Sequence, residues 1–96
     1  MLNLDETKQF LRVDGSEEDT LITSLIFTAK ELVESTLRKK LTDFEELPET
    51  VRQAMLIVVA TLYEERQVGK DKKGVGITDV LDLVRRMLFA YREEKF

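Results

Sequence analysis

The feature that most constrains the fold is an apolar run in the second half of the sequence. Within LPETVRQAMLIVVATLYEERQ, residues 47–67, the centre AMLIVVA at 54–60 contains no polar side chain. Pro48 suits the first position of a helix, and Gly69 marks its end. A helix that is apolar nearly all round is normally buried on most sides. A chain of 96 residues must therefore wrap this helix with its other segments, or cover part of it with another copy.

Two helices are expected before this run. Asn3 and Glu6 form a capping-box pattern at the start of residues 3–13, and the pair Asp14–Gly15 ends that short helix. Ser16 then acts as the N-cap of a second helix, with Asp19 at the reciprocal position. Apolar residues recur from 21 to 37 at three- and four-residue steps, and the basic run at 38–40 ends the helix.

A last helix follows the glycine-bearing basic loop at 70–76, with Thr78 or Asp79 as its cap. We therefore predict an all-α fold, a compact bundle of about four helices with a glycine-containing loop before the last one, in a single domain over residues 1–96. The residues predicted to form its core are Leu25, Ile26, Ala29, Val33, Val51, Met55, Val58, Leu62, Val84, Leu88 and Tyr91.

Composition disfavours catalysis and metal binding. The chain has no cysteine and no histidine, so it lacks the commonest metal ligand, general base and thiolate nucleophile. The glycines at 69 and 74 lack the Lys-Ser/Thr of a phosphate loop, and DGSEED lacks the spacing of a calcium loop. Glu31, Glu34, Glu64 and Glu65 are interpreted as solvated helix faces. We expect no enzyme activity, no cofactor and no metal.

Charge and hydropathy also bear on location and partners. The net charge is −4, which disfavours a sequence-specific nucleic-acid binder. Residues 1–48 carry six basic against eleven acidic side chains, and residues 49–96 carry nine against eight. No run is long enough to span a bilayer, and the acidic N-terminus does not resemble a signal peptide, so we expect an intracellular protein without membrane contact.

Two surfaces are candidates for partner contacts. On the last helix, Arg85, Phe89, Arg92 and Phe96 form a stripe beside the core face, which either covers a neighbouring helix or binds a partner. In the basic loop, Lys70, Lys72 and Lys73 either touch a nucleic-acid backbone or form a solvated turn. The acidic pair Glu17 and Glu18 is a candidate contact for that loop on the next copy of the chain.

The order of these segments resembles the small head–tail connector (adaptor) proteins of long-tailed phages, often labelled DNA-packaging proteins. The resemblance covers nearly the whole chain. It is most specific at the entry to the apolar helix and at two tyrosine motifs: Leu47, Pro48, Glu49, Val51, Arg52, Gln53, Ala54 and Met55, then Tyr63, Glu64 and Arg66, and finally Leu88, Tyr91 and Arg92. None of these residues forms a catalytic signature.

The resemblance implies a structural subunit of the virion neck, assembled in the bacterial cytoplasm. It implies a homo-oligomeric ring under the portal protein that extends the channel for duplex DNA, without sequence-specific binding, and meets the next neck or tail-completion protein. The last helix would engage the portal. The alternative is a small helical interaction or regulatory module without a virion role. The number of subunits does not follow from the sequence.

Overall fold

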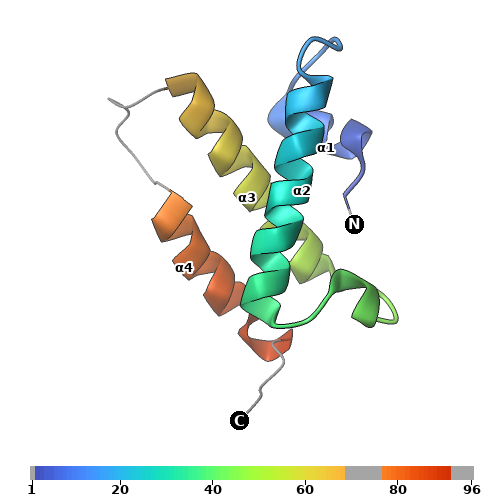
Figure 1. Ribbon diagram of the computed structural model, residues 1–96, viewed down its shortest axis with the longest axis vertical. Helices are drawn as coiled ribbons and strands as arrows, with labels where there is room; N and C mark the ends of the chain where they lie inside the picture. The colour runs from blue at the N-terminus through green and yellow to red at the C-terminus, as the bar shows by residue number, and fades with distance from the viewer. Residues whose placement is uncertain (1, 69–76, 92–96) are drawn as a thin grey trace.

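The computed structural model describes residues 2–68 and 77–91, and this part of the chain is all-α (Figure 1). Its elements are α1 (Leu4–Leu11), α2 (Asp19–Leu37), the 3-10 turn η1 (Leu41–Asp43), α3 (Glu49–Val68), α4 (Ile77–Leu88) and the 3-10 turn η2 (Phe89–Tyr91). The predicted all-α fold is confirmed.

Helix α1 begins at the predicted capping box. The Asn3 side chain accepts a hydrogen bond from the Glu6 backbone N–H at 2.8 Å, and the Asn3 N–H donates to the Glu6 carboxylate at 3.1 Å. Two N–H groups that a helix start leaves unpaired are thereby satisfied. At the other end Arg12 adopts a left-handed conformation, with φ of 61°, and closes the helix through its own N–H.

The predicted start of α2 was wrong. The helix begins at Asp19 with Glu18 as its N-cap, so Ser16 lies outside it and no side chain caps the first turn. Asp19 does not reach back to Ser16, because its carboxylate is bound to the Lys8 ammonium of α1 at 2.7 Å. Lys8 also donates to the carbonyl of Gly15. A contact between two helices therefore replaces the local cap.

The end of α2 also differs from the prediction. Leu37 is the last helical residue, and Arg38 is a left-handed C-cap whose N–H bonds the Glu34 carbonyl at 2.8 Å. The basic run at 38–40 thus lies beyond the helix. Glu34 is not simply solvated, because its carboxylate accepts a hydrogen bond from the Leu41 N–H at 2.7 Å and fixes the turn into η1.

The starts of α3 and α4 shift slightly from their predicted positions. Pro48 immediately precedes α3, and its carbonyl accepts from the N–H groups of Val51 and Arg52 at 3.1 and 3.2 Å. Helix α4 already includes Ile77, so Thr78 and Asp79 lie in its first turn and are not its cap. Differences of one or two residues at helix ends are common, because helix ends fray.

The surroundings of α3 show which segments cover its apolar sequence. It crosses behind α2 in Figure 1 and also packs against α4 and α1. Ile57 and Ala60 remain partly exposed within its apolar run. The chain's own helices therefore cover most of α3. Its buried residues are Val51, Ala54, Met55, Leu56, Val58 and Val59.

The residues predicted to form the core line this interior. Leu62 and Tyr91 are partly buried and pack against the buried cluster. The other nine are buried: Leu25, Ile26, Ala29, Val33, Val51, Met55, Val58, Val84 and Leu88.

The molecule is a thin slab that measures 42 by 28 by 17 Å. Its shortest dimension leaves room for about two layers of helix, since one helix with its side chains is about 10 Å across. Helices α2 and α4 both run from the top to the bottom of Figure 1. These two helices therefore point in the same direction along the slab.

Candidate docking surfaces

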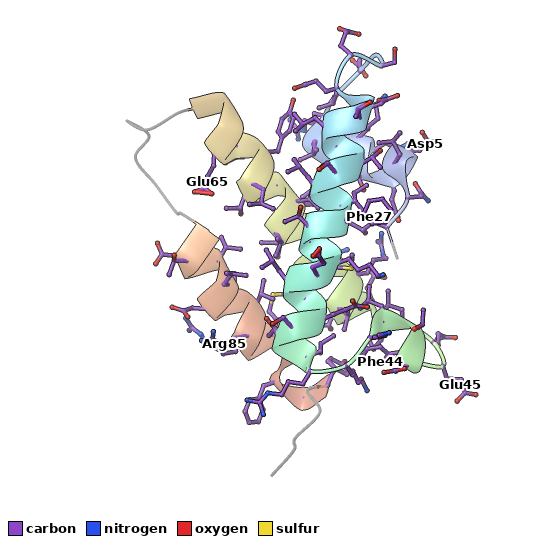
Figure 2. The ribbon with its side chains drawn as sticks, viewed as in Figure 1. Asp5, Phe27, Phe44, Glu45, Glu65 and Arg85 are labelled. Carbon is purple, nitrogen blue, oxygen red and sulfur yellow. The ribbon has the colours of Figure 1, made fainter. Side chains whose placement is uncertain are left out.

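The outer side of α4 carries the first candidate surface. Val80, Val84 and Leu88 are buried against the core, which turns the opposite side of the helix to solvent. Phe89, in η2, is 66% exposed. Arg85 is also exposed and pairs loosely with Asp82 at 3.3 Å; Figure 2 shows it on the edge of α4 that faces away from α2. Arg92 and Phe96, the other members of the predicted stripe, lie outside the described residues.

An aromatic contact fixes the end of α4. The Tyr91 ring meets Phe44 edge to face, with centroids 6.4 Å apart, and the Lys39 ammonium lies 4.0 Å from the centre of the Phe44 ring. Such contacts contribute roughly 0.5–1.5 kcal/mol each beyond burial. The turn that holds Phe89 is thereby tied to the segment after α2. Sequence reasoning missed this contact, because periodicity does not pair residues so far apart.

The acidic pair at the start of α2 divides between two environments. Glu17 is exposed, whereas Glu18 accepts a hydrogen bond from the Tyr63 hydroxyl at 2.6 Å. This hydrogen bond, together with burial, raises the pKa of Tyr63. Glu18 therefore joins α2 to α3 within one chain. Lys70, Lys72 and Lys73, its proposed partners on the next copy, lie outside the described residues.

A second polar cluster ties α1 to α3. Arg52 contacts the carboxylates of Glu6 at 2.5 Å and Glu49 at 2.9 Å. Hydrogen bonds from Arg52, and then from Gln53, lower the pKa of Glu49 to about 2. The pairing also raises the pKa of Arg52. Arg52 bridges Glu6 of α1 and Glu49 of its own helix, so the cluster holds two helices together.

The outer face of α2 is a surface that sequence reasoning overlooked. Phe27 is 54% exposed at its centre, as seen on the side of α2 away from α4 in Figure 2. Exposed, uncharged side chains lie around it at Thr20, Thr23, Ser24 and Thr28, and the exposed carboxylate of Glu31 follows one turn later. A helical projection of residues 19–28 would have shown this uncharged patch, which stands out in a chain that is 35% charged.

The described residues offer little for small-molecule chemistry. They contain no group of three or more metal-binding side chains, and none of their helices is long and apolar enough to cross a membrane. A groove between α1 and the following loop is mainly polar, and its Lys8 is already engaged by Asp19 and Gly15. The groove is lined by Asp5, Lys8, Gln9, Arg12, Val13, Asp14 and Gly15.

Comparison with known proteins gives the family. No curated protein and no solved structure matches the chain significantly. The family model described as phage gp6-like head-tail connector protein matches residues 1–92, which is nearly the whole chain. The match includes the apolar helix α3 and the candidate surface at the end of α4. The chain therefore belongs to the phage gp6-like head–tail connector family.

Proposed function

We propose that this protein is a structural component of the neck of a phage or prophage virion. Copies of the chain form an oligomeric ring that docks under the portal, extends the DNA channel and joins head to tail. Membership of the connector family supports a structural role in virion assembly and a location in the virion neck. The next neck or tail-completion protein binds the face of the ring away from the portal.

The proposal that the chain docks on the portal rests on the exposed aromatic side chain at the end of α4. Phe89 is the most exposed of the large hydrophobic side chains described, and Arg85 lies one turn before it. Aromatic and arginine side chains supply much of the binding energy at protein interfaces. Because Leu88 is buried and Tyr91 is held by Phe44, Phe89 is presented on a fixed turn. A preformed anchor loses little conformational entropy when it binds.

The charge of the chain suits passive passage of DNA. A net charge of −4 weakens the attraction to phosphates that dominates DNA affinity. A ring of such subunits lets duplex DNA slide through its channel without reading the sequence. The role is geometric and needs no catalytic group or cofactor.

Assembly with a portal tests the proposal. The purified chain is studied by sedimentation velocity over a range of concentrations, alone and mixed with the portal of the same phage. Negative-stain imaging then shows whether a ring lies beneath the portal. We expect a closed ring, coaxial with the portal, in the mixture. A chain that stays monomeric and unbound in the presence of the portal would overturn the proposal.

A further inference from the structure

Two outward helix faces carry matching rows of side chains. On α2 the row is Thr23, Phe27, Glu31 and Ser35, and on α4 and η2 it is Asp79, Leu83, Arg86 and Ala90. All eight are exposed, with Phe27 at 54% and Leu83 at 44%. Glu31, Asp79 and Arg86 make no ion pair within the part of the chain that the structure describes. Both rows therefore present an apolar centre and unused charge.

The spacing of the rows specifies one relative direction. When α2 and α4 lie parallel with Phe27 opposite Leu83, one turn further places Glu31 opposite Arg86. One turn earlier, Thr23 meets Asp79, and at the far end Ser35 meets Ala90. The antiparallel arrangement would instead place Glu31 against Asp79, and opposed like charges disfavour association. Charge complementarity thus favours the parallel contact.

The arrangement of the helices allows this contact between copies. Helices α2 and α4 run in the same direction along the slab (Figure 1). A rotation about an axis along these helices preserves their direction, so α2 of one copy meets α4 of the next copy in parallel. Contacts between two different faces propagate from copy to copy, and they close into a ring when the rotation between neighbouring copies divides a full turn evenly.

The α2 face can also be dehydrated at low cost. Its side chains near Phe27 are small and uncharged, which permits close approach of another helix. The Thr28 hydroxyl donates to the Ser24 carbonyl at 3.1 Å, so burial would not leave this donor unpaired. The charged member of the row, Glu31, is the one that faces Arg86 in the parallel arrangement.

From these observations we propose that the outer face of α2 docks a second copy of this chain through the Asp79–Leu83–Arg86–Ala90 row. The proposal rests on the ring-forming function above and identifies the two faces that meet. Phe27 and Leu83 form the apolar centre of the contact, and Glu31 pairs with Arg86 at its edge. Arg85 and Phe89 lie on a neighbouring stripe of α4 and stay available to the portal.

Cysteine cross-linking tests which faces meet, since the natural chain has no cysteine. The variant Ser35→Cys/Ala90→Cys changes only small side chains. Under mild oxidation we expect a ladder of covalent multimers. A disulfide requires Cα atoms within about 7 Å, so such a ladder would mean that residue 35 of one copy lies next to residue 90 of another. Either substitution alone should give no dimer, whereas a 1:1 mixture of the two single variants should give dimers. The control Ser16→Cys/Ala90→Cys, which places the first cysteine before α2, should give no ladder.

A charge exchange provides the second test. Glu31→Arg alone and Arg86→Glu alone should each weaken self-association about fivefold or more, because like charges then face each other. The double variant Glu31→Arg/Arg86→Glu should recover self-association, because opposite charges again face each other. Glu45→Arg makes the same charge change at an exposed site on neither face and should behave as the natural chain.

The outcomes separate the two proposals. If the natural chain forms a ring, but the cysteine pair does not link and the charge variants match the control, the ring stands and the α2–α4 contact is wrong. Dimers from Ser35→Cys alone would indicate a symmetric α2–α2 contact and would also overturn it. A natural chain that stays monomeric with the portal, and a cysteine pair that does not link, would overturn both proposals.

Discussion

The hydrogen bond between Tyr63 and Glu18 links residues that are 45 positions apart. Tyr63→Phe removes only the hydroxyl, and we expect the free energy of unfolding to fall by about 1 kcal/mol at neutral pH. The folded state raises the pKa of Tyr63 above 10.0. The contribution of this hydrogen bond to the free energy of unfolding is therefore full below pH 10.0 and is lost as pH rises through the folded-state pKa. Urea unfolding of the natural chain and of Tyr63→Phe, at pH 7 and above pH 10, measures this difference in the free energy of unfolding.

Tyr91→Phe is the matched control for this prediction. The Tyr91 hydroxyl makes no hydrogen bond within the described residues, while its ring keeps the Phe44 contact in the variant. Its stability should be close to that of the natural chain. Equal losses for the two variants would mean that the bond to Glu18 does not contribute to stability.

The Arg52 cluster predicts a pH dependence in acid. Arg52, and to a smaller extent Gln53, lower the pKa of Glu49 from 4.5 to about 2, so the contribution of ionised Glu49 to stability is present above pH 4.5 and is lost as pH falls towards 2. In Arg52→Gln the Glu49 pKa should return towards 4.5, as followed by NMR titration. The difference in melting temperature between the two proteins should shrink over the same range. Arg85→Gln, which removes an exposed pair, is the control; a Glu49 pKa unchanged by Arg52→Gln would contradict the prediction.

At the scale of elements, the left-handed cap of α2 gives a sharper prediction. Arg38 has φ of 60°, a conformation that costs a residue with a side chain about 1 kcal/mol and costs glycine almost nothing. We expect Arg38→Gly to raise the free energy of unfolding by about 0.5 kcal/mol, since the flexibility of glycine in the unfolded chain offsets part of the gain. Arg38→Ala removes the same charge but keeps the strain. Thermal denaturation that fails to rank Gly above Ala would refute this prediction.

The helices themselves follow from periodicity, but their ends do not. The apolar spacing of α2 and the run at 54–60 predict two buried helices, and hydrophobic burial makes that signal strong. The start of α2 was mispredicted because Lys8, from another helix, captures Asp19. The same limit applies to the docking surfaces. The Arg85–Phe89 stripe is visible in sequence, whereas the match between α2 and α4 needs their shared direction.

At the scale of the whole molecule, the two proposals together give α4 three environments at once. Its inner side closes the core through Val84 and Leu88, and its outer side has two neighbouring stripes. One stripe, with Leu83 and Arg86, faces the next copy in our proposal. The other, with Phe89, faces the portal in the function proposed above. A short helix at the edge of a thin slab can fulfil these roles together, because each uses a different part of its circumference.

This division predicts that the two outer functions of α4 can be lost separately. Phe89→Ser removes an exposed ring outside the core, so the fold and self-association should be retained while portal binding falls at least about tenfold, as expected for an aromatic anchor. Arg86→Glu should weaken self-association, and Arg86→Glu with Glu31→Arg should restore it. Sedimentation velocity measures self-association, and capture on immobilised portal measures portal binding. If Phe89→Ser abolished self-association as well, the stripes would form one surface, and the portal could not bind α4 in a completed ring.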